Sequence, residues 1–298
     1  MGTVFRIVLY APDSASASQV SELAFQRIAA LDRSMTDYQS GSELMLLCRK
    51  AGGPPVEVSA DLFRVLARAQ EISRRSEGAF DVTVGPVVRL WRQARTRHRL
   101  PAPQGLASAL KLVGYEKVRL NSTARTVQLL QAGMLLDLGA IAKGYAADEA
   151  LKLLKEHGIA CALVAGGGDI ALGDPPPGKG GWVVGIASLE GLDRSHLHRI
   201  LIHNAGISTS GDLEQHMVIA GTRYSHVVDP MTGQALTGRR SVTVIAPDDA
   251  TADSLATAVS VLGPGRGLKL INSMPGTSAL FIEQVDQGLR TFEAKFPK

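Results

Sequence analysis

The spacing of hydrophobic positions changes along the chain, and each spacing predicts an element. Residues 3–10 alternate polar side chains with Val, Ile, Phe and Tyr, which predicts a first strand that ends before Pro12. Residues 16–35 repeat apolar side chains at helical intervals, behind serines that can cap the helix. A further helix is predicted from a cap at Ser59 to about Ser76.

The next part of the chain predicts turns and short strands. Asp81 lies between apolar residues and glycines in the segment 78–86, and taken alone it is typical of a turn residue. Residues 92–104 are basic and polar, and we interpret them as a loop. Residues 118–130 predict a pair of strands joined by a turn at Asn121.

A possible anion site follows at the centre of the chain. The apolar run 133–136 predicts a short buried strand, and Asp137 follows it as a capping acid. A helix then runs to about His157, before a glycine placed for a left-handed cap. Lys143 lies in its first turn, where a cation is mildly unfavourable against the helix dipole. A strand, a tight turn and a helix N-terminus with a lysine are typical of a phosphate site, but a lysine that reaches to solvent is an equal alternative.

Strand patterns dominate the second half of the chain. Strands are predicted at residues 161–164, 182–186, 199–203, 207–211, 224–228 and 241–246. The glycines 166–168 follow a strand, but they lack the GxGxxG spacing and no clear helix pattern follows, which argues against a Rossmann site. Helices and strands alternate without a regular βαβ rhythm. We therefore predict one α+β domain rather than a doubly wound sheet.

Two sets of polar residues in this half have candidate chemistry. His226 lies near a predicted strand end, before a turn that begins at Asp229. It is a candidate acid, base or ligand, and the alternative is a structural histidine bonded to a backbone carbonyl. Asp253 and Thr257 are four residues apart on a predicted helix, so their oxygens share a face that points away from the apolar stripe. Two hard oxygens suit Mg²⁺, whereas the alternative is an ordinary first-turn acid and a threonine without special function.

The composition narrows the function classes. The chain has 298 residues, of which 45% are hydrophobic and 20% charged, as expected of a folded protein. A net charge of +4 without a dense Lys/Arg tract indicates no nucleic-acid partner but permits small anionic ligands. Cys48 and Cys161 lie in apolar contexts without zinc or CxxC spacing, so we expect buried thiols. No segment has the length of a membrane span and the first residues lack a signal-peptide pattern, which predicts a soluble, untargeted chain.

Taken together, these motifs resemble the ApbE family of flavin transferases. The matching motifs are Met1-Gly2-Thr3, Tyr38 with Ser42-Glu43, residues 78–86, residues 136–148, Gly167-Gly168-Asp169, residues 208–211, residues 226–233 and residues 252–257. The resemblance covers nearly the whole chain. It implies that residues 1–298 form a single ApbE-like, T-fold-like α+β domain with mixed sheets and flanking helices.

The resemblance also implies an activity and a set of site residues. The expected reaction is the Mg²⁺-dependent transfer of FMN from FAD to a Ser or Thr hydroxyl of an acceptor protein, with release of AMP. The acceptor motif is an acid followed by Ser/Thr-Gly-Ala-Ser/Thr. The implied metal ligands are the carbonyl of Ala140, Asp253 and Thr257. The implied FAD site is lined by Met1, Ser40, Gly41, Ser42, Asp81, Lys143 and Val227. The implied catalytic residues are His226 for proton transfer, the nearby Asp229, and Lys143 as a second positive charge.

Two alternatives and two departures accompany this expectation. The first alternative function is an FAD pyrophosphatase that gives FMN and AMP, and the second is a flavin-binding protein without turnover. Cys48 stands where relatives commonly have Asn, so contacts of that side chain are expected to be lost or altered. Relatives are usually exported and often lipid-anchored, whereas this chain shows no leader, which predicts either a removed leader or a cytoplasmic member.

Overall fold

A seven-stranded antiparallel sheet forms the centre of the protein. The computed structural model describes residues 2–186, 189, 198–211, 216–286 and 288–297. In spatial order the strands are β1 (Phe5–Leu9), β5 (Ala162–Gly166), β6 (Asp169–Leu172), β9 (Ala205–Gly211), β13 (Arg240–Ala246), β14 (Ser278–Val285) and β15 (Gly288–Ala294). Every neighbouring pair is antiparallel, unlike the strands of a doubly wound sheet. The predicted α+β class is confirmed.

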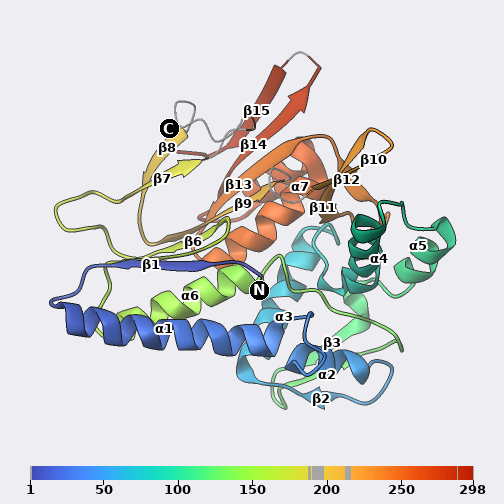
Figure 1. Ribbon diagram of the computed structural model, residues 1–298, viewed down its shortest axis with the longest axis horizontal. Helices are drawn as coiled ribbons and strands as arrows, with labels where there is room; N and C mark the ends of the chain where they lie inside the picture. The colour runs from blue at the N-terminus through green and yellow to red at the C-terminus, as the bar shows by residue number, and fades with distance from the viewer. Residues whose placement is uncertain (1, 187–188, 190–197, 212–215, 287, 298) are drawn as a thin grey trace.

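Long helices cover one face of this sheet. α6 (Ala142–Glu156) and α7 (Asp249–Ser273) pack on the strands, and α1 (Ser14–Met35) packs on α6 (Figure 1). Side chains alternate across β13, so that Val244 belongs to the core under the helices and Ile245 to the core on the opposite face. Both faces of the sheet are therefore buried at its centre.

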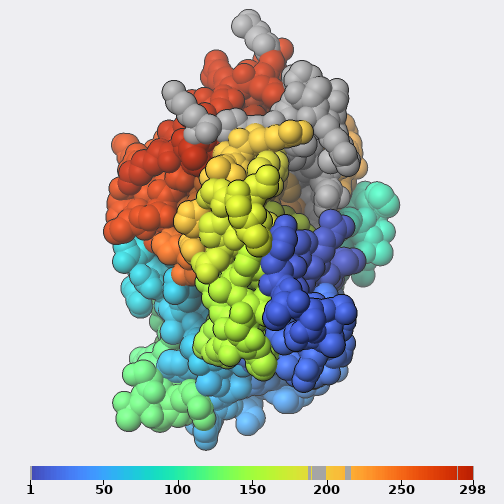
Figure 2. Space-filling view, turned by 90° about the vertical axis from the view of Figure 1, so that its left-hand side faces the viewer, coloured from blue at the N-terminus to red at the C-terminus, as the bar shows by residue number. Residues whose placement is uncertain are grey.

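A two-stranded hairpin contributes to the core on the opposite face. Its strands are β7 (Trp182–Ile186) and β8 (His198–Ile202), which pair antiparallel. Val184 and Ile200 of the hairpin share a buried cluster with Leu280 of β14. In Figure 2 the N-terminal strand and helix, in blue, lie beside the yellow-green chain that runs from α6 toward this hairpin.

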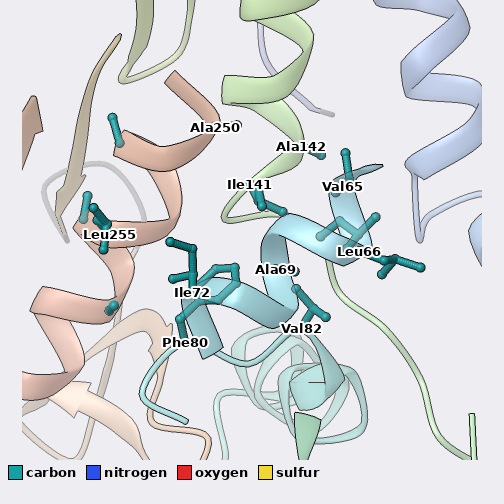
Figure 3. Packing of buried hydrophobic residues seen from close by; sticks show 14 of the residues in the cluster. Val65, Leu66, Ala69, Ile72, Phe80, Val82, Ile141, Ala142, Ala250 and Leu255 are labelled. Atoms are coloured by element: carbon teal, nitrogen blue, oxygen red, sulfur yellow. The ribbon is translucent and has the colours of Figure 1, made fainter. Parts of the chain in front are cut away.

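The remaining elements are shorter helices and two small sheets. They are α2 (Glu43–Arg49), α3 (Ala60–Arg75), α4 (Gly85–Arg97), α5 (Pro103–Leu110), the turns η1 (Val82–Val84) and η2 (Tyr115–Lys117), the sheet of β2 (Val56–Glu57), β4 (Thr126–Leu129) and β3 (Val118–Asn121), and the sheet of β10 (His216–Ile219), β11 (Thr222–Val228) and β12 (Ala235–Thr237). The largest core lies where α3, α6 and α7 meet, around Ile72, Phe80, Ile141 and Leu255 (Figure 3). Among the described helices, none combines the length and hydropathy that a membrane crossing needs.

The prediction of a loop at residues 92–104 is wrong. α4 continues to Arg97, and α5 begins at Pro103. Val87, Trp91 and Ala94 have helical spacing and are buried against the sheet that contains β11. The apolar stripe is narrow and the charged residues between its members face away from it, which is why the segment resembled a loop.

The prediction of a strand at residues 133–136 is also wrong. This segment is buried at Met134 and Leu136 but pairs with no strand. The Leu136 N–H donates to Cys48 Sγ at 3.3 Å, and the next N–H donates to the carbonyl of Val82 at 2.8 Å. Asp137 does not cap α6, because its carboxylate accepts the N–H of Gly139 at 2.8 Å instead. The segment is extended backbone held by individual contacts.

The other predicted elements are confirmed, with ends that shift by a few residues. α1 is capped by Asp13 rather than by a serine, since its carboxylate accepts the N–H of Ser16. Gly158 has a φ of 82° just after α6, as a left-handed cap requires. Cys48 is buried as expected, whereas Cys161 is partly exposed and lies 3.1 Å from the carbonyl of Pro175.

Candidate functional site

Three segments that are far apart in the sequence meet at Lys143. Its Nζ lies 3.1 Å from Oδ2 of Asp253 on α7 and 3.2 Å from Oδ2 of Asp169 on β6. It also donates to the carbonyl of Gly139 at 2.7 Å. Both carboxylates are almost completely buried. The alternative of a lysine that simply reaches to solvent is therefore wrong, and its position against the helix dipole is offset by two ion pairs.

Close packing of α6 against α7 makes these ion pairs possible. A Cβ on Gly144 would lie 2.3 Å from the carbonyl oxygen of Asp249, so only glycine permits this approach. The Gly144 N–H lies 3.4 Å from Asp253 Oδ2 and donates to it. In a regular helix this N–H would donate to the carbonyl of Ala140. That carbonyl accepts no hydrogen bond from the described residues.

The sequence pattern placed Asp253 on a polar face of α7, away from the apolar stripe. In the structure Asp253 is buried on this face as well. Its side chain is 6% exposed, and Leu255, Ala256 and Val259 are also buried. α7 is covered by the sheet, α6 and α3 together, so it lacks the wide polar face of a surface helix. Thr257, one turn after Asp253, is partly exposed.

Acidic side chains outnumber basic side chains in this cluster. Asp249 is fully buried, and neither of its carboxylate oxygens has a hydrogen-bond partner among the described residues. Burial raises the pKa of Asp249 and of Asp253, and the nearby Asp169 raises both further. Burial lowers the pKa of Lys143, but the charges of Asp253 and Asp169 outweigh this and raise it. One ammonium thus faces three acidic side chains.

The donor set at this cluster fits a hard divalent cation. Ala140 offers a carbonyl oxygen to which no described residue donates, Asp253 offers a carboxylate and Thr257 a hydroxyl, and Mg²⁺ prefers such oxygens. An added positive charge would also balance the excess of buried carboxylates. Within the described part of the chain, no group of three or more His, Cys, Asp or Glu side chains is placed to hold a metal. A metal here would therefore depend on the carbonyl and hydroxyl oxygens.

The glycine turn before Asp169 is enclosed by two other motifs. A Cβ on Gly167 would lie 3.1 Å from Thr3 Oγ1, and one on Gly168 would lie 2.8 Å from the carbonyl of Thr209. Ser208 donates its hydroxyl to Asp169 Oδ1 at 2.5 Å. The N-terminal, Gly-Gly-Asp and Ser-Thr-Ser-Gly motifs are thus one assembly around Lys143.

Two acids near Lys143, Asp169 and Asp249, received no functional role from the sequence. The acid directly after three glycines was a signal for Asp169, because glycines let a backbone come close to other groups. Nothing in the local pattern distinguished Asp249 from an ordinary first-turn acid.

A cavity of about 500 Å³ lies between the N-terminal segment and α1. Its lining is mostly apolar and consists of Gly2, Thr3, Val4, Phe5, Phe25, Ile28, Ala29 and Asp32. Met1, which the resemblance places at the FAD site, lies outside the described residues. The cavity adjoins the Gly167 turn through Thr3.

The other expected FAD residues have structural contacts of their own. Ser42 is buried and caps α2, because its hydroxyl accepts the N–H of Met45 at 3.1 Å, while Ser40 and Gly41 are exposed. Asp81 is buried and caps η1, since it accepts the N–H and the hydroxyl of Thr83 at 2.8 and 2.7 Å. Burial raises the pKa of Asp81, which these hydrogen bonds partly oppose.

His226, Val227 and Asp229 lie on or just after β11, which packs against α7. The side chain of His226 is exposed, and that of Val227 is buried. Asp229 is bound within its own turn, where its oxygens accept the N–H of Met231 at 2.8 Å and the hydroxyl of Thr232 at 2.9 Å. The turn thereby fixes the end of the strand that carries His226.

We expect Lys143→Ala to destabilise the protein by up to about 3 kcal/mol. The substitution leaves Asp169 and Asp253 buried without their cation. Removing the unfavourable interaction of the lysine with the helix dipole gains about 0.3–1 kcal/mol, but breaking a buried ion pair costs more than this. Urea unfolding measures the change. Lys152→Ala on the same helix is the control, because among the described residues that lysine forms only an exposed pair with Glu156. An unchanged or increased free energy of unfolding in Lys143→Ala contradicts the structural role of the ion pairs.

Comparison with known proteins identifies similar chains. Residues 1–281 match the model of the ApbE family. The FAD:protein FMN transferase of Treponema pallidum is 35% identical over 297 residues, which cover 95% of this chain and 82% of the relative. An FAD:protein FMN transferase of Klebsiella pneumoniae is 32% identical, with 95% and 86% covered. The solved structure of the flavin transferase ApbE from Vibrio cholerae has a TM-score of 0.88 at 30% identity and covers 99% of this chain and 94% of that chain.

Proposed function

This chain belongs to the ApbE family, and we propose that it is an FAD:protein FMN transferase, which moves FMN from FAD onto an acceptor protein. The observation that supports this most directly is the assembly around Lys143, in which the lysine and the carboxylates of Asp169 and Asp253 converge from three separate family motifs. We further propose that the acceptor group is a Ser or Thr hydroxyl. Its oxygen bonds to the FMN phosphorus, the bond from that phosphorus to the bridging oxygen breaks, and AMP leaves.

Ala140, Asp253 and Thr257 are the proposed Mg²⁺ ligands. When bound there, Mg²⁺ neutralises charge on the phosphoryl oxygens of FAD. The support from this chain is the carbonyl of Ala140, to which no described residue donates a hydrogen bond, and the buried carboxylates of Asp253 and Asp169 beside a single ammonium. Lys143 is proposed to bind a phosphoryl oxygen as a second positive charge at the N-terminus of α6, while Gly139 and Asp169 keep its ammonium in place.

His226 is the proposed proton acceptor. Its exposed side chain is accessible to a hydroxyl of a second protein, and an imidazole that is neutral near pH 7 accepts the proton as that oxygen attacks. Asp229 holds the turn after β11, so we assign it a positioning role for His226. Met1, the turn from Ser40 to Ser42, Asp81 and Val227 are the proposed FAD-lining residues.

FAD, and not FMN, is expected to label the acceptor. An acceptor with the motif of an acid followed by Ser/Thr-Gly-Ala-Ser/Thr should gain one FMN on its last hydroxyl, because only FAD has the pyrophosphate whose AMP half is a good leaving group. Intact mass and in-gel fluorescence measure the label, and AMP is measured in parallel. The control acceptor has Ala in place of that last hydroxyl residue. AMP release without label across several acceptors would indicate an FAD pyrophosphatase, and neither product would leave only flavin binding.

A further inference from the structure

Arg92 on α4 connects two segments of the proposed site. Its Nη2 lies 2.7 Å from Asp137 Oδ2, and its Nη1 donates to Asp37. The guanidinium carbon is 4.8 Å from the centre of the Tyr38 ring, which places the cation over the aromatic face. Asp137 is 12% exposed and Asp37 is 21% exposed, so both carboxylates are largely withdrawn from water.

Each of these two carboxylates belongs to a segment with a proposed role. Asp37 begins the turn that leads to Ser40–Ser42, the proposed flavin-binding turn. Asp137 accepts the Gly139 N–H with its other oxygen, Oδ1, at 2.8 Å. The carbonyl of Gly139 then accepts from Lys143, and the next residue provides the proposed metal-binding carbonyl. One guanidinium therefore joins the flavin side of the site to its metal side.

Without Arg92, these two segments would repel each other. Burial raises the pKa of Asp137, the charge of Arg92 lowers it, and the charge of Asp37 raises it. Asp37 and Asp137 are thus close enough to interact, and the guanidinium compensates both. A neutral side chain at position 92 would leave two partly buried like charges across the gap.

We infer that Arg92 is a positioning residue of the transfer reaction, which sets the separation between the turn at residues 37–42 and the segment at residues 137–140. The inference rests on the proposed function. Arg92 acts through Asp137 and Gly139 on the Ala140 carbonyl and on Lys143, and through Asp37 on the flavin-binding turn.

The chain contains a matched control in Arg27. This arginine also joins two carboxylates, since it donates to Asp61 at 2.6 and 2.7 Å and to Glu149. Its side chain is 25% exposed, compared with 38% for Arg92. It connects α1, α3 and α6 and contacts none of the described residues of the proposed site. Arg27→Gln therefore removes a similar clamp elsewhere in the protein.

The test compares Arg92→Gln, Arg27→Gln and the double variant Arg92→Gln/Asp137→Asn. For each, FAD binding is titrated by fluorescence quenching at several Mg²⁺ concentrations, FMN transfer is measured against Mg²⁺, and the melting temperature is recorded. Arg92→Gln is expected to raise the Mg²⁺ concentration that gives half of the maximal effect, in FAD binding and in FMN transfer, about tenfold or more. This is the usual effect of losing a group that orients a metal ligand. Arg27→Gln is expected to lower the melting temperature without that shift.

The double variant separates positioning from direct contact with the ligand. Asn at position 137 still accepts the Gly139 N–H but has no charge to compensate, so it should recover most of the loss in Arg92→Gln. No recovery would overturn the inference in favour of a direct contact between Arg92 and FAD. Equal Mg²⁺ dependence in Arg92→Gln and Arg27→Gln would overturn it in favour of a purely structural role. Absence of transfer in the wild type would refute the proposed function. If the Mg²⁺ dependence of FAD binding still shifts in Arg92→Gln and not in Arg27→Gln, Arg92 positions the Mg²⁺ and FAD sites of a protein that is not a transferase.

Discussion

Asp253→Asn is expected to lower FMN transfer by about a hundredfold or more, because it removes the only charged ligand proposed for Mg²⁺. The amide keeps the size of the side chain and can still accept the Gly144 N–H, and Asp169 still pairs with Lys143. The protein should therefore remain folded. Transfer rates measured against Mg²⁺ concentration, together with a melting curve, test both parts of this expectation.

Asp249→Asn provides the matched control for this substitution. It removes one carboxylate of the same buried cluster, one helical turn earlier, at a residue that is not a proposed ligand. Its oxygens have no hydrogen-bond partner among the described residues, so neutralising it should not reduce stability, and most of the activity should remain. Full activity of Asp253→Asn at low Mg²⁺ would refute the metal assignment. Equal losses in both variants would instead indicate a general electrostatic effect.

His226→Asn is expected to reduce transfer by about 10²–10⁴, the range usual for the loss of a general base. FAD affinity should change little, because the imidazole is proposed to act on the acceptor hydroxyl and not on the flavin. Single-turnover transfer with saturating FAD measures the rate, and fluorescence quenching measures the affinity.

His203→Asn is the control for this second substitution. His203 is an exposed histidine that follows β8 and lies outside the proposed site. Its replacement should leave both the rate and the affinity unchanged. A transfer rate in His226→Asn within a factor of about three of the wild type would assign the proton transfer to another group.

The structure also changes the interpretation of Lys143. The sequence placed a lysine unfavourably in the first turn of α6, and a bound phosphate was one explanation. The described residues provide another, because Asp169 and Asp253 already compensate the charge. Phosphate binding and structural pairing are compatible in one lysine. The unfolding experiment on Lys143→Ala measures the structural role alone.

Most of the elements could be predicted from the sequence, because the spacing of apolar side chains is a property of short windows. The helix that carries Lys143, the strand that carries His226 and the helix that carries Asp253 were all recognisable in this way. The order of the motifs was sufficient for the resemblance to the family that the comparisons then confirmed. The prediction for the basic segment after Trp91 was wrong because the apolar stripe of that helix is narrow. Whether such a segment forms a helix depends on burial against a sheet that is distant in the sequence.

The arrangement of the site was decided only by the tertiary structure. Asp253 is buried because the sheet, α3 and α6 enclose α7, and no local pattern records which faces of a helix its neighbours will cover. Asp169 reaches Lys143 because β6 pairs between β5 and β9 while α6 packs on the same sheet. Arg92 and Asp137 meet across 45 residues of chain for the same kind of reason. Spacing along the chain determines which side chains share a face, whereas chain reversal and packing determine which charges become neighbours, and the chemistry of this site depends on those neighbours.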